Sequence, residues 1–229
     1  MRGEITGDLR LHELDHDGAI LEALDAVDSR ASFLSKVFVG SAGLLGALAA
    51  PEGGRAAASS DTAILNFALT LEYLQASFYT ETERIGAVAG ELARVPKQLG
   101  SVERAHVTAL KTVLGRAAVQ RPSFDFRGTT EDQAKFLKTA VAFEDLGTAA
   151  YKGQATRLKS PGLLAAAVSI HSVEARHAAW MRYLAGFTPA ASAFDEGKPA
   201  SEVREIVAST RFIVARPRRT GRRPPRFTG

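Results

Sequence analysis

The chain has 229 residues, of which 45% are hydrophobic and 24% are charged, and this fits one globular domain with a sizeable core and tails. Because there is no cysteine, disulfides, thiolate metal sites and cysteine nucleophiles are all excluded. The formal net charge is +4, but six arginines lie in the last fourteen residues, where there is no acid, and removing them leaves −2. A near-neutral body is not expected to bind nucleic acid, whereas the basic tail is suited to anionic surfaces.

Residues 1–60 are expected to form a leader. An acidic stretch is followed by Ser29-Arg30-Ala31-Ser32-Phe33-Leu34, an apolar run of 14 residues at 37–50, and small residues. That order resembles a secretory signal, and the run is shorter than the roughly 20 residues that span a membrane. The motif resembles a twin-arginine export signal in which Ala31 replaces the second arginine. We expect export to the periplasm, cell wall or extracellular space; a cytoplasmic protein with a non-exported N-terminal helix or a misassigned start is the alternative.

Periodicity and capping residues predict four long helices over residues 61–86, 91–118, 131–158 and 163–185. Asp61 is the expected N-cap of the first helix, and Pro96 is an alternative start for the second. Thr129 and Thr130 are expected to open the third helix. The turn at 159–162 precedes the fourth, and Gly186 stops it.

The links between these segments predict an all-α four-helix bundle over residues 61–214. Short links join the first helix to the second and the third to the fourth, so each pair should be an antiparallel hairpin. The longer link at 119–128 can reach about 35–45 Å, and a helix of ~25 residues spans about 37 Å, so this link can cross the full bundle. A short helix and an apolar segment within 193–214 should pack back onto the bundle. The Arg-rich tail at 215–229 is expected to be disordered.

The two halves of the predicted bundle carry the same pattern of acids and imidazoles. Glu72 is followed 31 residues later by Glu103 and then His106, and Glu144 is followed 30 residues later by Glu174 and then His177. Each half therefore supplies one lone Glu and one Glu-x-x-His. This is the ligand pattern of two metal ions inside a four-helix bundle.

Both lone glutamates lie on apolar helix faces. Glu72 has Leu65, Ala68 and Leu69 one and two turns away, and Glu144 has a similar set. An ionised carboxylate in an apolar interior costs several kcal/mol unless it is paired or metal-bound. Two divalent cations would balance the charge of four carboxylates, and a carboxylate–imidazole set suits Fe or Mn. The predicted ligands are Glu72, Glu103, His106, Glu144, Glu174 and His177.

Other candidates have two interpretations each. His171 lies one turn before Glu174 and is either a hydrogen-bonding partner of a ligand or a satisfied core histidine. Asp145 should be solvated or act as a cap. Tyr79 and Tyr151 each follow a lone Glu by seven residues; they either donate hydrogen bonds near the metals or pack ordinarily.

Three stretches carry a resemblance to a known family. They are Ala63–Leu74, Phe143-Glu144-Asp145 with Ala150–Gly153, and Glu174–Ala179. The sequence resembles the ferritin-like family that includes the desiccation-related proteins, over about residues 61–214. The resemblance implies a ferritin-like four-helix bundle with a long crossover between its second and third helices. It also implies two iron or manganese ions at the six residues above, and members of the family are often exported.

Three functions are compatible with the sequence. The first is an exported dimetal-carboxylate protein with a redox role, either Fe(II) oxidation or peroxide removal, whose partners are metal ions and O₂ or peroxide. The second is a non-enzymatic stress-protection, desiccation-protection or cell-envelope protein with a vestigial metal site. The third is a mini-ferritin that binds DNA through its basic tail. It is least supported because the body is near neutral and the basic residues are confined to the tail, and export would contradict it.

Overall fold

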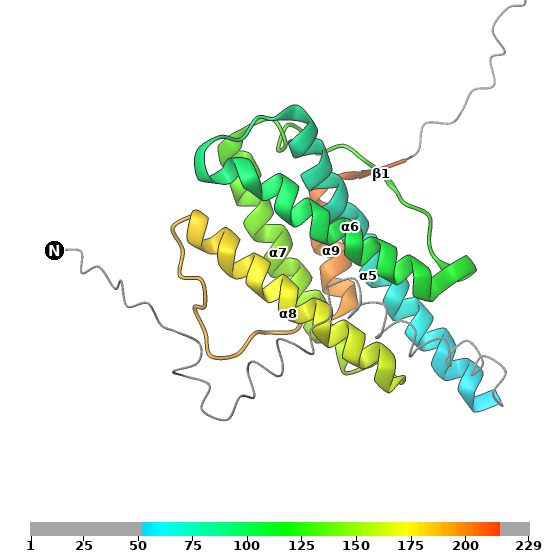
Figure 1. The fold of residues 1–229 in the computed structure, drawn as a ribbon. Coiled ribbons are helices and arrows are strands. Elements are labelled where there is room, and N and C mark those ends of the chain that lie inside the picture. The colour runs from blue at the N-terminus through cyan, green and yellow to red at the C-terminus, as the bar shows by residue number, and fades with distance from the viewer. Residues whose placement is uncertain (1–51, 216–229) are drawn as a thin grey trace, which may run out of the picture. The chain divides into compact units, whose positions relative to one another are not determined.

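The computed structural model describes residues 52–215, and side chains from residue 60 onward. The apolar run and export motif of the expected leader, and the tail after residue 215, lie outside the described residues. Four long helices form the bundle: α5 (Glu52–Ile85), α6 (Val95–Leu114), α7 (Gln133–Ala155) and α8 (Pro161–Leu184) (Figure 1). The prediction of an all-α four-helix bundle is confirmed. Among the helices of the described range, none has the length and apolarity that crossing a membrane requires.

Capping residues set where three of the four helices begin. Pro96 lies in the first turn of α6, after the short 3₁₀ helix η2 (Gly90–Arg94), so the alternative start of the second helix holds. The α7 helix begins after Asp132, which accepts a hydrogen bond from the Lys135 N–H, and not at Thr129 or Thr130 as predicted. Ser160 caps α8 as an acceptor from the Leu163 N–H.

The expected role of Asp61 is wrong. The α5 helix begins at Glu52, so Asp61 lies inside it and caps nothing in its own helix. Its buried carboxylate instead accepts hydrogen bonds from the backbone N–H groups of Lys159 and Ser160, both at 2.9 Å. Asp61 therefore fixes the turn between α7 and α8 against α5, because its carboxylate is the acceptor for two N–H groups of that turn.

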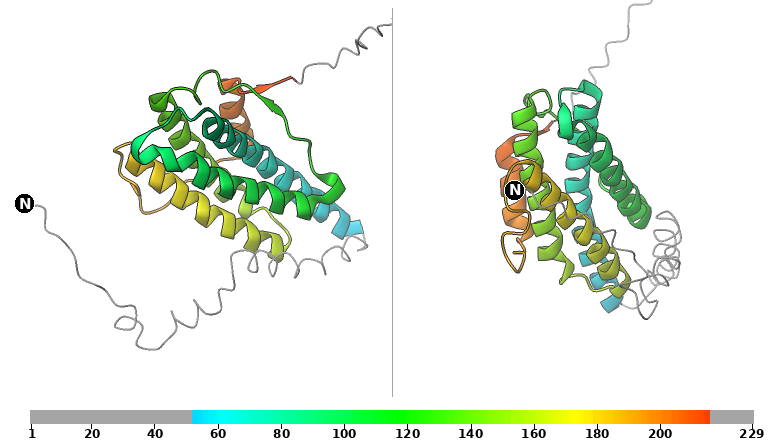
Figure 2. Two further views of the ribbon diagram at one scale, coloured as in Figure 1. Left: turned by 45° about the horizontal axis from the view of Figure 1, so that its top comes forward. Right: turned by 60° about the vertical axis from the view of Figure 1, so that its left-hand side comes forward.

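The helices pair as two hairpins, α5 with α6 and α7 with α8, and α5 also contacts α7. The link between α6 and α7 begins with the 3₁₀ helix η3 (Gly115–Ala117) and runs back along α5, from the end of α6 to the start of α7 (Figures 1 and 2). The Asn66 side chain bonds the backbone of Ala117 and Val119, and Arg121 donates to Ser77 three turns further along α5. The long crossover is confirmed.

The C-terminal segment packs back onto the bundle, as predicted. The α9 helix (Ala200–Thr210) buries Val203 and Val207 in the core against α7. Beyond it, β2 (Ile213–Val214) pairs antiparallel with β1 (Ser123–Phe124) of the crossover, so that Ser123 lies opposite Val214. The last described residues therefore tie the crossover to the bundle.

Two apolar clusters fill the interior. One is aromatic, with Phe78 stacked on Phe136 and in edge contact with Phe126 and Phe143. The other contains Leu65 and Leu69 of α5 with residues from the other three long helices. Glu72 belongs to neither cluster and is fully buried in the same core.

Candidate metal centre

Each long helix carries acidic or imidazole side chains to one interior point. Glu72 comes from α5 and Glu144 from α7, while α6 and α8 each supply a Glu and, one turn later, a His. Residues three apart on a helix project side by side, which is why each Glu-x-x-His presents both groups to the same place. All four glutamates are 0% exposed, whereas the two histidines are each 8% exposed. The structure therefore brings together all six residues predicted as ligands.

The six side chains form two overlapping groups. One contains Glu72, Glu103, Glu174 and His106, and the other contains Glu103, Glu144, Glu174 and His177. Within each group the potential ligand atoms all lie within 4.8 Å of one another. Glu103 and Glu174 belong to both groups, so α6 and α8 supply the shared carboxylates, and α5 and α7 each supply a carboxylate to one group only.

The histidines present their Nδ1 atoms to the carboxylates. His106 Nδ1 lies 3.3 Å from Glu72 Oε2, 3.2 Å from Glu103 Oε2 and 3.2 Å from Glu174 Oε1. His177 Nδ1 lies 2.9 Å from Glu103 Oε1 and 3.3 Å from Glu144 Oε2. Glu103 thus directs one oxygen toward each imidazole.

Several of the inward-facing atoms keep lone pairs that no hydrogen bond uses. One oxygen of each glutamate, together with His177 Nδ1, finds no hydrogen-bond partner among the described residues: Glu72 Oε2, Glu103 Oε1, Glu144 Oε2 and Glu174 Oε1. Buried polar atoms are almost always hydrogen-bonded, and an unsatisfied one costs about 1–3 kcal/mol. The imidazole Nδ1 atoms lie 2.9–3.3 Å from these oxygens but make no well-aligned hydrogen bond with them, and lone pairs that converge on a common point in this way are what metal coordination requires. The residues present therefore fit a metal-binding site.

The pKa values of the buried groups show that the carboxylates are costly to ionise together. Burial raises the pKa of the Glu72 carboxyl to about 7, and burial together with the Glu103 charge raises the pKa of Glu174 well above its usual range. Burial would also raise the pKa of Glu103, but the two imidazoles beside it outweigh burial and lower it to about 2. Burial opposes protonation of His177, yet Glu103 and Glu144 raise its pKa to about 10. Without metal, protons must supply the positive charge that these carboxylates need.

Two tyrosines orient Glu72 and Glu144, and each tyrosine belongs to a different helix from the glutamate that it holds. Tyr79 of α5 donates a hydrogen bond to Glu144 Oε1 of α7, and Tyr151 of α7 donates one of 2.5 Å to Glu72 Oε1 of α5. Each tyrosine therefore serves the glutamate of the other repeat, not the one seven residues before it. The structure decides between the two interpretations of these tyrosines in favour of hydrogen bonds at the site.

Gln75 and Gly147, which sequence reasoning did not assign to the site, support Glu174. Gln75 Nε2 donates to Glu174 Oε2 at 3.3 Å, and a Cβ built on Gly147 would lie only 2.7 Å from the same oxygen. Each follows a lone glutamate by three residues, so both lie on the site-facing side of their helices. The sequence carried one signal for each residue. Gln75 is polar and Gly147 is a glycine inside a helix, and both lie on helix faces that are otherwise apolar.

His171 and Asp145 do not contact the six residues in any described hydrogen bond or ion pair. Burial lowers the pKa of His171, while Asp195 and the Thr148 backbone oppose that shift. Asp145 pairs with Arg182 Nε of α8 at 2.8 Å. Asp145 links α7 to α8 and does not act as a cap, and its side chain is 33% exposed, which agrees with the expected solvated position.

Comparison with known families agrees with this geometry. Residues 60–186, more than half of the chain, match the model of the ferritin-like domain. No curated protein was found to match the sequence. Membership of the desiccation-related subgroup stays a prediction. The chain belongs to the ferritin-like domain family.

Proposed function

We propose that this protein binds two divalent metal ions, iron or manganese, and uses them in a redox reaction with O₂ or peroxide. One ion would be held by Glu72, Glu103, Glu174 and His106, and the other by the second group of four residues. Bound there, the ions would supply reversible one-electron chemistry at positions open to a small oxidant. The observation that carries the proposal is the set of four inward-facing carboxylate oxygens that make no hydrogen bond among the described residues.

Charge balance supports the number of ions. Four buried carboxylates carry four negative charges, which two divalent cations neutralise while both histidines stay neutral. A single ion would leave two carboxylates unbalanced in the interior, and a buried charge without a partner is unfavourable. Glu103 and Glu174, which belong to both groups, would help to hold both ions.

The protein's own residues would hold the carboxylates in place and limit the entry of water. The Tyr79 and Tyr151 hydroxyls fix the rotamers of Glu144 and Glu72, and Gln75 fixes that of Glu174. The glutamates are fully buried, so the partly exposed imidazoles of α6 and α8 mark the side from which solvent comes closest.

The test is a metal count with a matched pair of variants. The protein is loaded with Fe(II) without oxygen, or with Mn(II), freed of excess metal, and analysed for metal per chain. We expect two ions per chain in the wild type, a clear loss in Glu144→Gln, and wild-type loading in Asp145→Asn, because Asp145 faces Arg182 and not the site. Fewer than one ion per chain with either metal would overturn the proposal.

Reactivity is measured on the loaded protein. Oxidation of bound Fe(II) by O₂, or consumption of peroxide by the manganese form, is expected to stop in Glu144→Gln. Metal binding without either reaction would favour the non-enzymatic alternative. Export stays a prediction and is tested by whether the mature protein is found outside the cytoplasm with residues 1–60 shortened.

A further inference from the structure

The two Glu-x-x-His segments do not use their glutamates in the same way. On α6, Glu103 directs Oε2 to His106 Nδ1 at 3.2 Å and Oε1 to His177 Nδ1 at 2.9 Å. On α8, Glu174 Oε1 lies 3.2 Å from His106 Nδ1, but the described residues show no ion pair between Glu174 and His177, which is one turn later on the same helix. Glu103 therefore approaches both imidazoles, whereas Glu174 approaches only the imidazole of the other helix.

Gln75 and Gly147 account for the position of the Glu174 carboxylate. Glu174 Oε2 accepts a hydrogen bond from Gln75 Nε2 at 3.3 Å, and it lies where a side chain on Gly147 would displace it. Both Gln75 and Glu174 are buried, so bulk water does not compete for this bond. A hydrogen bond to an ionised carboxylate is stronger than one between neutral groups. One oxygen of Glu174 is thus already engaged, and only Oε1 keeps lone pairs that no hydrogen bond uses.

The repeat in the sequence contains the origin of this difference. Gln75 and Gly147 occupy the same place in the two halves, three residues after Glu72 and Glu144 respectively. No side chain other than a histidine donates to Glu103 in the part of the chain that the structure describes. A single amide, present in one half and replaced by a glycine in the other, therefore breaks the equivalence that the repeated ligands would otherwise have.

We propose that Gln75 makes the two metal positions unequal. The ion beside His106 is held by three carboxylates, because Glu72, Glu103 and Glu174 each place an oxygen 3.2–3.3 Å from that imidazole nitrogen. Glu174 is kept at this position by its hydrogen bond to Gln75. The unequal positions presuppose the proposed function, because they concern the same two ions.

The position beside His177 has fewer close ligands. Within the described residues, its imidazole approaches only Glu103 and Glu144, at 2.9 and 3.3 Å. Affinity for a divalent cation follows the number of charged ligands that surround it. The position beside His106 should therefore fill first. The position beside His177 should bind its ion more weakly and keep more room for a small exogenous ligand, so it is where the oxidant would bind.

The order of filling is tested with Glu72→Gln and Glu144→Gln, which neutralise the fully buried lone glutamate of one half each. Mn(II) is added to the metal-free full chain without oxygen, and binding is followed by calorimetry and by the EPR spectrum of the bound ions. In the wild type we expect two steps whose dissociation constants differ by about tenfold or more. The spectrum should be that of an isolated ion after the first step and of a coupled pair after the second.

The two variants should then differ in which step they lose. Glu144→Gln should keep the tight step and lose the weak one, whereas Glu72→Gln should lose the tight step. Two equal steps in the wild type, or a tight step that survives in Glu72→Gln and disappears in Glu144→Gln, would overturn the unequal positions and leave the proposed function intact. No binding step at all in the wild type would overturn both.

Gln75→Leu tests the cause of the difference, because it removes the amide donor at similar size. With Oε2 released, Glu174 is no longer held at one ion, and the ratio of the two dissociation constants should fall by about tenfold. Gln75→Met repeats the test if the leucine variant does not fold. A ratio that stays at the wild-type value in a folded Gln75 variant would reject Gln75 as the cause.

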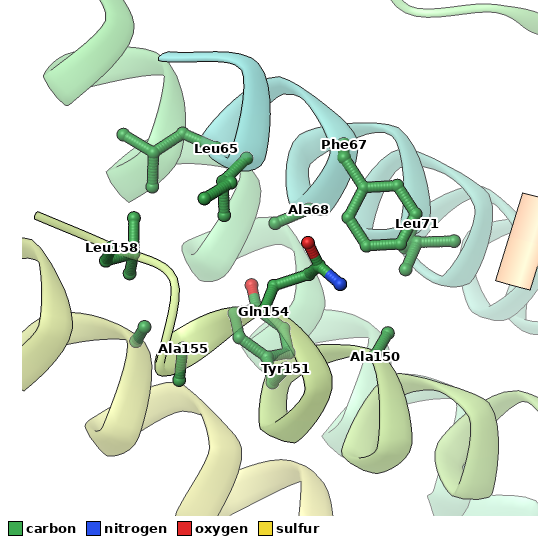
Figure 3. Close-up of a pocket in the computed structure, with 11 residues that line it drawn as sticks. Leu65, Phe67, Ala68, Leu71, Ala150, Tyr151, Gln154, Ala155 and Leu158 are labelled. Carbon is green, nitrogen blue, oxygen red and sulfur yellow. The ribbon is translucent and has the colours of Figure 1, made fainter. Parts of the chain in front are cut away.

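Gln154→Leu is the matched control. Gln154 is also a buried glutamine, but its side chain extends from α7 toward Ala68 and Leu71 of α5 in a small apolar pocket (Figure 3). Its Oε1 accepts a hydrogen bond from Arg157 and not from the site. Both Mn(II) steps should therefore keep their wild-type values in Gln154→Leu. A convergence of the two steps as large as that in Gln75→Leu would show that loss of any buried amide is sufficient, and would reject the specific role of Gln75.

Discussion

Gly147 gives the sharpest test of how the bundle interior is built around Glu174. In Gly147→Ala the new Cβ would lie 2.7 Å from Glu174 Oε2, and ordinary contact begins at 3.4 Å, so the carboxylate must move by about 0.7 Å. The atom in the way is the end of a side chain, so the fold can adapt. Metal ligands, however, must lie within about 0.2 Å of their required distances.

The expected result is a loss of metal affinity with little loss of stability. Displacing a supported ligand lowers metal affinity by about 10–100-fold, which corresponds to about 1.4–2.8 kcal/mol. Replacing glycine by alanine in a helix interior stabilises by about 0.5–1 kcal/mol, which offsets the local crowding in the metal-free protein. Titration with Mn(II) in a calorimeter measures the first quantity, and urea unfolding of the metal-free protein measures the second.

Gly153→Ala on the same helix is the matched control, because we expect it to lower stability and to leave metal affinity unchanged. Its Cβ would lie 2.0 Å from the Lys198 carbonyl oxygen, which is backbone and cannot rotate away. The segment before α9 must then separate from α7, and we expect about 1–3 kcal/mol of lost stability with unchanged metal affinity. The reasoning is refuted if Gly147→Ala binds Mn(II) as tightly as the wild type, or if it loses as much stability as Gly153→Ala.

Three further predictions follow from the same contacts. Tyr79→Phe removes the donor to Glu144 and should cost about 1.5–3 kcal/mol in the metal-free protein, whereas Tyr73→Phe, whose hydroxyl bonds the crossover at 3.4 Å, should cost less; urea unfolding compares them. Asp61→Ala should destabilise the bundle by about 1–3 kcal/mol, since the Lys159 and Ser160 N–H groups lose their acceptor, and should leave the metal count unchanged. Metal-free protein should become less stable from pH 5 to pH 9. The folded-state pKa values of Glu72 and His177 are about 7 and about 10, against ordinary values of 4.5 and 6.5. The stabilisation that comes from binding these protons is fully present at a pH below the ordinary pKa values. It is lost as the pH rises through the raised pKa values of the folded state. Unfolding free energies that stay flat or rise over this range would contradict the assignment.

Local pattern alone determined much of the fold and of the candidate site. Helix periodicity marked the four long segments, and Pro96 marked the start of the second. The repeated Glu and Glu-x-x-His selected the six residues that the structure brings together. Such inferences succeed because the spacing of residues along one helix fixes which side chains share a face.

Contacts between helices decided the rest. The Asp61 carboxylate could have capped its own helix, and only the position of the turn between α7 and α8 shows that it accepts from Lys159 and Ser160. The sequence placed Tyr79 and Tyr151 seven residues after their glutamates, yet each bonds the glutamate of the other helix. The need for a glycine at position 147 follows from the nearby Glu174 carboxylate, which belongs to another helix. Helical spacing specifies direction within one element, whereas partner, distance and free volume depend on how separate helices pack, and no single helix encodes these.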